Sequence, residues 1–542
     1  MSVSSGNHTK PCGLSGARAQ LETSRACVTK RVGELTKTKI MNLDALQKRA
    51  SLARSKGETI VLAHGVFDVL HLGHMRHLKE AKACGDRLIV TLTSDRYVNK
   101  GPDRPIFKAE MRAEMIAALE IVDWVAINDA PNAINLIETI RPDVYVKGKE
   151  YAAPELDVTG GISREQSAVE ARGGKVHFTD DITFSSSNLI NRHFNPYDSE
   201  LKTYLEQNKT SDLIDKLINL IDSVADYRVL LVGDTIIDEY CYVDPLGKSP
   251  KENMIATQYR DREIFAGGVI AAANHVAGFC REVEVITTLG ADDPFTDLVC
   301  QSLKPNVRLR PTFLPGRPTV RKRRYVESGY LRKLFEVYTI DERPISGAEE
   351  AEVWQSATRS AAEMDLVIVT DFGHGMITPQ IIDGLTNNAR FLAVNTQSNS
   401  ANLGFNLITR YTRADYICID APEARLAMSD KFSDLDFLIR DRLSNRVACD
   451  RLIVTQGKLG CTTYDAAFGV HHVPSFTRTV VDTVGAGDAF LTVTSPLVAS
   501  GGRMEHVGFI GNAAGAMKVG IVGHRTSVEK APLVKYLSAL LK

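Results

Sequence analysis

The sequence has no excess of charge of either sign and no apolar run long enough to cross a bilayer. Its 542 residues include 65 basic and 66 acidic side chains, which leave a formal net charge of −1. A near-neutral chain offers no bulk attraction for nucleic acid or an anionic membrane, and a spanning helix needs about 20 consecutive apolar residues. We therefore predict that neither nucleic acid nor a membrane is a partner of this protein.

Cysteine is scarce and irregularly placed: nine residues are scattered along the chain, and no Cys-x-x-Cys pair occurs. This spacing is typical of reduced thiols in a cytoplasmic protein and argues against a disulfide framework or a cysteine-based zinc site. Hydrophobic residues make up 44% of the chain and charged residues 24%, as in globular proteins. At this length we expect two or three domains, each with its own core.

The chain changes character along its length. Residues 1–45 are rich in Ser, Thr and basic residues, and we predict a disordered extension. Residues 46–195 alternate short apolar strands with helices, which predicts a Rossmann-like α/β domain on a parallel sheet. Residues 196–225 are predicted to form a helical linker. From 226 to 542 the α/β alternation resumes, and a basic, alternating stretch at 318–340 predicts the strands of a small β lid.

The string Asp482-Thr-Val-Gly-Ala-Gly-Asp488 directly precedes a predicted helix. Backbone N–H groups at a helix start are unpaired, and glycine lets a phosphate approach them closely. We therefore expect an anion hole at Gly485, Ala486 and Gly487. Asp488, in the first turn, is positioned to accept the proton of an attacking hydroxyl group as a catalytic base.

This string resembles the signature of the ribokinase-type sugar kinases, and the resemblance extends over residues 228–527. It implies a ribokinase-like α/β fold, ATP as co-substrate and Mg²⁺ as cofactor. Asp420 and Glu423 stand where the family has Asn-x-x-Glu, and they would bind the nucleotide by holding Mg²⁺, directly or through water. The other residues that the resemblance implies are Asp234, Asp238, Gly267, Gly268, Lys322 and Arg324 for the sugar, and Thr455, Gly457, Gly460 and Asn512 for the nucleotide.

A second motif, Gly65-Val-Phe-Asp-Val-Leu-His-Leu-Gly-His74, lies between the first predicted strand of the N-terminal domain and the helix that follows. His71 and His74 are three residues apart, so both imidazoles can face one pocket at the helix start. There they can donate hydrogen bonds to phosphate and stabilise the charge on a departing pyrophosphate. His77 extends the pattern to HxxHxxH, and a metal cluster is therefore a weaker alternative.

The motif is similar to the signature of the cytidylyltransferase-like nucleotidyltransferases, and Arg141-Pro-Asp-Val-Tyr-Val-Lys-Gly148 resembles their sugar-phosphate adenylyltransferase branch. The resemblance implies that His71 and His74 hold the nucleoside triphosphate, together with Val66, Phe67, Lys100, Arg112 and Lys147. Two segments depart from that branch. Lys149-Glu150 replaces Gly-Asp, and 183–188 replaces a Ser-Thr-Thr loop, so both ATP and CTP stay open as co-substrate.

Together, the two resemblances suggest a protein like the bifunctional heptose-phosphate kinase/heptose 1-phosphate adenylyltransferases, with its domains in reversed order. The kinase would phosphorylate a sugar or sugar phosphate. The N-terminal domain would then transfer a nucleotidyl group to the sugar 1-phosphate and release pyrophosphate. A homo-oligomer is compatible with this hypothesis.

Two alternatives remain open. One is an alcohol-phosphate cytidylyltransferase, such as one for glycerol phosphate, fused to a sugar kinase. The other is a nucleotide- or sugar-sensing protein with a degenerate kinase site. The sensing alternative is motivated by Ala271, where the family has a sugar-contacting Asn, and by Asp420.

Overall fold

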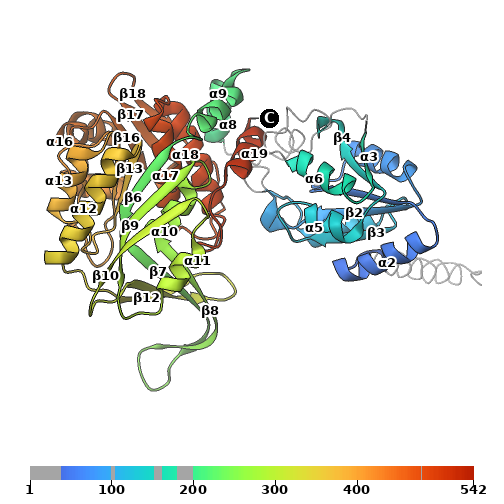
Figure 1. Ribbon diagram of the computed structural model, residues 1–542, viewed down its shortest axis with the longest axis horizontal. Helices are drawn as coiled ribbons and strands as arrows, with labels where there is room; N and C mark the ends of the chain where they lie inside the picture. The colour runs from blue at the N-terminus through green and yellow to red at the C-terminus, as the bar shows by residue number, and fades with distance from the viewer. Residues whose placement is uncertain (1–37, 99–103, 152–160, 180–198, 478, 542) are drawn as a thin grey trace, which may run out of the picture. The chain divides into compact units, whose positions relative to one another are not determined.

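The computed structural model describes residues 38–98, 104–151, 161–179, 199–477 and 479–541. Contacts divide the chain into two compact units, whose described residues lie within 38–179 and 199–541 (Figure 1). Most of the predicted extension lies outside these residues. In the described ranges, no helix is long and apolar enough to pass through a membrane.

The described part of the N-terminal unit is built on a five-stranded parallel sheet in the order β3-β2-β1-β4-β5. Successive residues of its central strand point to opposite faces, so that Val61 and Ala63 enter one core while Ile60 and Leu62 enter the other. Parallel strands need crossover helices, which cover both faces. The elements are α2 Leu43–Ser55, β1 Ile60–Gly65, α3 Leu72–Ala83, β2 Arg87–Thr93, α4 Ala109–Ala117, β3 Trp124–Asn128, α5 Ile134–Ile140, β4 Val144–Gly148, α6 Gly161–Glu170 and β5 Lys175–Thr179.

The described part of the C-terminal unit contains a nine-stranded sheet in the order β10-β9-β6-β13-β14-β15-β16-β17-β18. It is parallel from β10 to β16, and β17 and β18 add an antiparallel edge. Its strands are β6 Arg228–Gly233, β9 Glu282–Gly290, β10 Val307–Leu314, β13 Leu366–Asp371, β14 Leu392–Thr396, β15 Tyr416–Asp420, β16 Arg451–Thr455, β17 Cys461–Asp465 and β18 Gly469–Val473.

Helices cover both faces of this sheet, and each face has a separate hydrophobic core. One core takes in side chains of α10, α17, α18 and α19, and the other takes in side chains of α12, α13 and α14. These helices are α10 Val269–Val276, α12 Gly347–Glu363, α13 Pro379–Asn388, α14 Ala421–Met428, α17 Ala486–Ala499, α18 Met504–Lys518 and α19 Lys530–Leu540.

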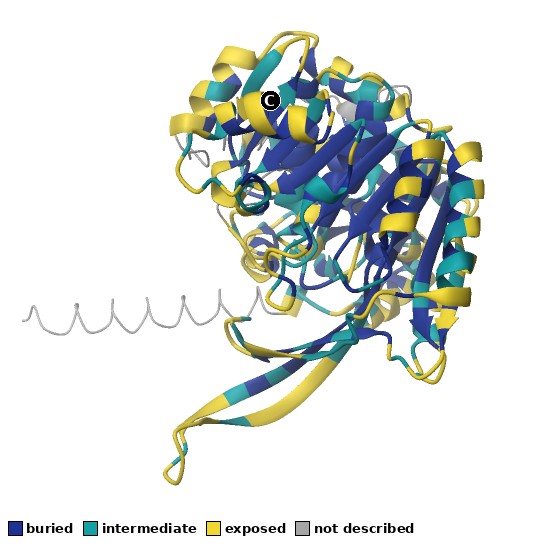
Figure 2. Ribbon diagram, turned by 90° about the vertical axis from the view of Figure 1, so that its left-hand side faces the viewer, coloured by how far each residue is buried: buried dark blue, intermediate teal, exposed yellow. Residues whose placement is uncertain are grey.

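The predicted β lid is present as part of a separate four-stranded sheet in the order β12-β11-β7-β8. Its strands are β7 Thr235–Lys248, β8 Ile255–Gly268, β11 Val320–Glu327 and β12 Lys333–Thr339. The hairpin of β7 and β8 extends away from the α/β body, and its outer part is exposed (Figures 1 and 2). Sequence patterning did not predict this hairpin, because Pro245 and Gly247 shift its register and its tip carries no apolar alternation.

The segment predicted as a helical linker, 196–225, contains two helices, α8 Ser199–Asn208 and α9 Leu213–Asp222. Their apolar faces are buried in the core of the C-terminal unit, through Leu205, Leu217 and Ile221 among others. Both helices are therefore structural parts of that unit.

Helices α17 and α18 pack closely because glycine faces an aromatic ring. A Cβ added at Gly511 would lie 2.5 Å from Cζ of Phe490, whereas one at Gly515 would lie 3.6 Å from Cδ2 of the same ring. The first distance requires movement, and the second is ordinary van der Waals contact. Close packing at Gly511 thus holds the helix that carries the predicted anion hole.

We expect Gly511→Ala to lower the free energy of unfolding of the C-terminal unit by about 1–3 kcal/mol, because overpacking displaces the ring. Gly515→Ala is the matched control and should raise it by up to about 1 kcal/mol through better helix propensity. Urea unfolding followed by Trp354 fluorescence measures both, in a Trp124→Phe background that silences the other tryptophan. Equal effects of the two substitutions would contradict the packing argument.

Candidate active sites

The histidine motif forms the loop between β1 and α3, at the carboxyl end of the parallel sheet. Strands β2 and β3 lie on one side of β1, and β4 and β5 lie on the other. Open α/β sheets bind ligands at such a switch point. His71 caps α3, and its Nδ1 accepts the N–H of Gly73 at 3.1 Å. The ring of His74 stacks on that of His71 with centroids 3.9 Å apart, so the structure brings the predicted pair together.

The backbone of this loop is strained, and hydrogen bonds to other segments of the N-terminal unit hold its conformation. Phe67 and Val69 have φ angles of 50° and 48°, in the left-handed region that such residues rarely adopt. Between them, the carboxylate of Asp68 accepts the N–H groups of Ile106 at 2.8 Å and Phe107 at 3.1 Å. The surrounding structure thus imposes the loop conformation.

Arg112, predicted to contact phosphate, lies fully buried in α4. Its guanidinium donates to the Val66 carbonyl at 2.5 Å and to the Asp95 carboxylate at 2.6 Å. It also donates to the carbonyl groups of Thr93 and Phe107, each at 2.9 Å. In this structure the Arg112 side chain therefore stabilises the conformation of the histidine loop by hydrogen-bonding its backbone.

The remaining N-terminal candidates have mixed surroundings. Lys147, at the end of β4, pairs with Glu165 of α6 at 2.9 Å, so a phosphate would share this ammonium with a carboxylate. Nδ1 of His77 lies 2.9 Å from Oγ1 of Thr179. No group of three or more His, Cys, Asp or Glu in the described ranges could hold a metal ion. Lys100 and the segment 183–188 lie outside the described residues.

The predicted anion hole forms the start of α17 in the C-terminal unit. Gly485 is the N-cap with a φ of 73°, a left-handed conformation that favours glycine, and Ala486 and Gly487 begin the helix. Asp488 follows in the first turn and is buried. Burial raises the pKa of Asp488 to about 6, against the opposing effect of His524. A carboxylate with a pKa near neutrality suits proton abstraction.

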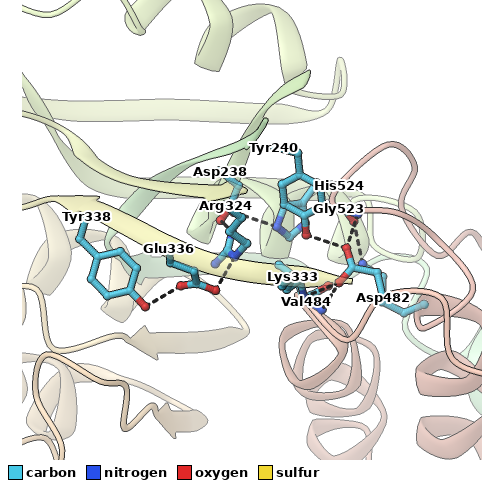
Figure 3. A network of polar contacts seen from close by, with 11 residues as sticks. Asp238, Tyr240, Arg324, Lys333, Glu336, Tyr338, Asp482, Val484, Gly523 and His524 are labelled. Carbon is cyan, nitrogen blue, oxygen red and sulfur yellow. Dashed lines mark hydrogen bonds and ion pairs between the residues drawn. The ribbon is translucent and has the colours of Figure 1, made fainter. Parts of the chain in front are cut away.

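Asp238 of β7 is buried between the guanidinium of Arg324 and the imidazole of His524 (Figure 3). One of its oxygens pairs with Arg324 of β11, and the other lies 3.1 Å from Nε2 of His524. Arg324 also forms an ion pair with Glu336 of β12, in which Nε lies 3.1 Å from Oε1. Burial raises the pKa of Asp238, but Arg324 and His524 outweigh it and hold the pKa well below its usual range. Asp238 is therefore a carboxylate throughout the physiological pH range.

Asp234 and Lys322 provide a second pair of predicted sugar-side groups. Burial, followed by the charge of Asp371, raises the pKa of Asp234 to about 7. Burial also lowers the pKa of Lys322, whose ammonium lies 5.5 Å from the centre of the Tyr338 ring. Asp234 directly precedes β7, and Lys322 lies on β11 of the lid sheet. Both side chains have lost hydrating water on burial, and the hydroxyl or phosphate groups of a ligand could replace it.

Asp482 joins the lid to the anion-hole loop (Figure 3). Its carboxylate accepts hydrogen bonds from Tyr240 of β7 at 2.6 Å and from Lys333 of β12 at 2.7 Å. It also accepts the backbone N–H groups of Gly523 at 2.8 Å and Val484 at 3.1 Å. Burial raises the pKa of Asp482, but these donors outweigh it and lower the pKa to about 2.

Lys518 is a buried cation beneath the anion hole. Its ammonium donates to the carbonyl groups of Val484 at 2.7 Å and Gly523 at 2.8 Å, and so ties the anion-hole loop to the turn after α18. The side chain is fully buried, and burial lowers its pKa. Its charge in turn lowers the pKa of Asp488.

The predicted magnesium residues form a capping box at the start of α14. Asp420 accepts the N–H of Glu423 at 2.7 Å, and Glu423 accepts the N–H of Asp420 at 2.9 Å. Burial, followed by the charge of Asp420, raises the pKa of Glu423 to about 8. Two adjacent carboxylates repel each other when both are ionised, and a bound cation would relieve this repulsion. Carboxylate oxygens are also the ligands that Mg²⁺ prefers.

The predicted nucleotide turn lies between β16 and β17, after Thr455. Gly457 and Gly460 have φ angles of 57° and 92°, and a Cβ on Gly460 would lie 2.0 Å from the Val473 carbonyl. Asn512 of α18 is buried and donates to that same carbonyl at 3.3 Å. In this structure Asn512 therefore supports the edge strands beside the turn.

Sequence reasoning did not predict His524 or Lys518 as site residues. Both residues lie beside the anion hole only because the folded chain brings the turn after α18 against the anion-hole loop. Lys518 did leave one signal, because it ends an uncharged run from Val507 to Met517 that the helical pattern buries.

Comparison with known proteins identifies both segments. A family described as "Cytidylyltransferase-like" matches residues 62–192, and the "pfkB family carbohydrate kinase" family matches residues 383–531. The chain joins a nucleotidyltransferase-like domain to a carbohydrate kinase domain. The two matches occur in the order that the motifs predicted.

Curated relatives match about the N-terminal 30% of the chain. The "Bifunctional protein HldE" of Methylobacillus flagellatus is 43% identical over 157 residues, which cover 28% of this chain and 31% of that protein. The protein of the same name from Wolinella succinogenes is 43% identical over 139 residues, which cover 25% and 29%. The chain thus spans less than a third of the length of these relatives.

Two solved structures resemble the larger unit. Phosphofructokinase-2 from Escherichia coli, in complex with potassium, is 14% identical with a TM-score of 0.47, and the match covers 58% of this chain and 99% of that one. Ribokinase from Thermotoga maritima is 18% identical with a TM-score of 0.44, at the same coverage of 58% and 99%.

Arg112→Lys should destabilise the N-terminal unit by about 1–3 kcal/mol and reduce nucleotidyl transfer, because lysine cannot reproduce a planar fork that bonds several carbonyl groups. Urea unfolding followed by Trp124 fluorescence, in a Trp354→Phe background, measures the stability. Arg96→Lys is the control, because the side chain of Arg96 is 63% exposed and pairs with Asp129 alone among the described carboxylates. Wild-type stability in Arg112→Lys would contradict the role assigned to this guanidinium.

Lys518→Met should shift the acid limb of kinase activity to higher pH. Asp488, the predicted base, can accept a proton only when deprotonated, and loss of the nearby cation raises its pKa from about 6. Lys518→Ala should lose turnover and regain part of it with ammonium chloride, because two carbonyl groups would face a space of ammonium size. Tetramethylammonium, which has no N–H donor, should not restore activity. Lys530→Met, on α19, serves as the control, and an unmoved acid limb in Lys518→Met would count against the electrostatic link.

Proposed function

We propose that the chain is a bifunctional sugar-activating enzyme. The C-terminal unit would transfer the γ-phosphoryl group of ATP to a hydroxyl group of a sugar or sugar phosphate. The N-terminal unit would transfer a nucleotidyl group to the sugar 1-phosphate and release pyrophosphate. The observation that carries the kinase half is Asp488, a buried carboxylate with a pKa of about 6 beside the glycine-rich start of α17.

The geometry supports a separate role in phosphoryl transfer for each group of site residues. Asp488 takes the proton of the substrate hydroxyl as that oxygen attacks phosphorus. The N–H groups at Gly485–Gly487 stabilise the negative charge on the phosphoryl oxygens. Asp238 and Asp234, both in the lid-side part of the unit, accept hydrogen bonds from sugar hydroxyl groups. Lys322 adds positive charge for an anionic substrate.

Asp420 and Glu423 would hold Mg²⁺, because they supply carboxylate oxygens and the raised pKa of Glu423 favours an added positive charge. When bound, the ion would neutralise charge on the nucleotide phosphates. Their N-cap hydrogen bonds leave at least one Asp420 oxygen for a direct or water-mediated contact.

In the N-terminal unit, His71 and His74 would donate hydrogen bonds to the triphosphate at the switch point of the sheet. His71 accepts a backbone N–H through Nδ1, so its neutral ring carries the proton on Nε2. The resemblance of residues 141–148 to the sugar-phosphate adenylyltransferase branch favours a heptose-phosphate-like substrate. The cytidylyltransferase-like match supports the alternative of CTP with an alcohol phosphate.

Crossed variants test the two-site proposal. Asp488→Asn should lower kinase turnover by about 10²–10⁴-fold, since it removes the base, and should leave nucleotidyl transfer intact. His74→Ala should show the reverse pattern. Mass spectrometry of a panel of sugars, sugar phosphates and glycerol phosphate with ATP or CTP measures both reactions and discriminates the nucleotides.

Circular dichroism of both variants controls for folding. A folded variant that lost both activities would contradict separate sites. A wild-type chain that modified no member of the panel would favour a sensing role over an enzymatic one.

A further inference from the structure

The turn after α18 is held rigidly against the anion-hole loop. Gly523 donates its N–H to Asp482 and accepts a hydrogen bond from Lys518 through its carbonyl group. A buried anion and a buried cation thus fix this residue from both sides. The next residue, His524, is placed by this turn, and its side chain is only 7% exposed.

Two glycines leave room for the His524 ring and its carboxylate partner. A Cβ at Gly267 would lie 2.0 Å from Oδ2 of Asp238 and 3.0 Å from Nε2 of His524. A Cβ at Gly485 would lie 2.7 Å from Cε1 of His524. The imidazole therefore lies between the carboxylate of Asp238 and the backbone of Gly485, the first residue of the anion hole.

The two ring nitrogens of His524 have different surroundings. Nε2 lies 3.1 Å from the Asp238 carboxylate. Nδ1 is buried and has no hydrogen-bond partner among the described residues, and it would lie 3.3 Å from a Cβ at Gly485. A buried polar atom without a partner costs about 1–3 kcal/mol, so an arrangement that supplies one is favoured.

We propose that His524 completes the anion hole, donating a hydrogen bond from Nδ1–H to the phosphoryl group while Nε2–H stays bound to Asp238. The inference rests on the proposed kinase function and adds a residue to that centre. Both nitrogens donate only in the imidazolium form. Binding of the phosphoryl group would therefore be accompanied by proton uptake at His524.

The charges around the ring are consistent with this coupling. Asp238 contacts the ring, and the other charged groups around this pair of residues are Asp488, Lys518, Lys322 and Arg324. A phosphoryl group brings negative charge to the side of the ring that faces Gly485. Opposite charges in a water-poor site attract strongly, and this shifts the ring towards its protonated form.

Isothermal titration calorimetry tests the coupling with Mg²⁺-ADP and aluminium fluoride, a mimic of the transferred phosphoryl group. Titrations of the full chain in buffers of different ionisation enthalpy give the number of protons taken up. We expect wild type to take up more protons than His524→Gln at the same pH. Equal uptake would overturn the proposal. Failure of wild type to bind the mimic would instead count against the kinase function itself.

Kinetics with two isosteric variants separates phosphoryl contact from the positioning of Asp238. The amide of His524→Gln reaches the place of Nε2 and can still bond Asp238, whereas that of His524→Asn lies near the place of Nδ1. We expect His524→Gln to lose about 10²-fold in kcat with little change in the KM of the sugar, and His524→Asn to keep more turnover.

The opposite order, with His524→Gln close to wild type, would show that the ring only holds Asp238 and would overturn the proposal. His472→Ala is the matched control, because that histidine lies on β18 with a side chain 62% exposed. Its turnover and proton uptake should equal those of the wild type.

Discussion

The kinase centre depends on the burial of one carboxylate, that of Asp482. Burying an ionised carboxylate is unfavourable unless donors surround it, and removing a partner from a buried ion pair typically costs about 3–5 kcal/mol. Here the donors come from three places: the lid through Tyr240 and Lys333, the anion-hole loop through Val484, and the turn at Gly523. Satisfying this single group therefore brings together segments that are more than 200 residues apart in the chain, such as Tyr240 and Asp482, whose separation is 242.

The two units present backbone N–H groups to a phosphate in similar ways. Each places a glycine-containing loop at the start of a helix, where unpaired N–H groups can receive phosphate. In each, a buried cation from another helix bonds backbone carbonyl groups of that loop: Arg112 in the N-terminal unit and Lys518 in the C-terminal unit. The N-terminal loop would not keep its conformation on local interactions alone, as the left-handed Phe67 and Val69 show.

Charge in the kinase centre is arranged so that neighbouring carboxylates behave differently. Asp238, between Arg324 and His524, stays ionised, whereas burial raises the pKa of Asp234 to about 7 and that of Asp488 to about 6. A permanently charged group is suited to orienting a ligand, and a group that titrates near neutrality is suited to moving a proton. Aspartate is thus suited to two different roles in this unit because its surroundings differ.

Local sequence was sufficient for the features that depend on short-range pattern. The alternation of strands and helices predicted both α/β units. The strings around His71 and Asp488 predicted two loops that lead into helices, because glycine and a capping side chain act within one turn. Local pattern could not show that the long hairpin of β7 and β8 joins the predicted lid, since its charged tip carries no alternation.

Only the tertiary structure decided which side chains face one another. It showed that Arg112, predicted to contact phosphate, hydrogen-bonds backbone carbonyl groups around the histidine motif, and it placed His524 and Lys518 beside the anion-hole loop. These relationships arise from packing and charge burial between residues far apart in sequence, which no local pattern records.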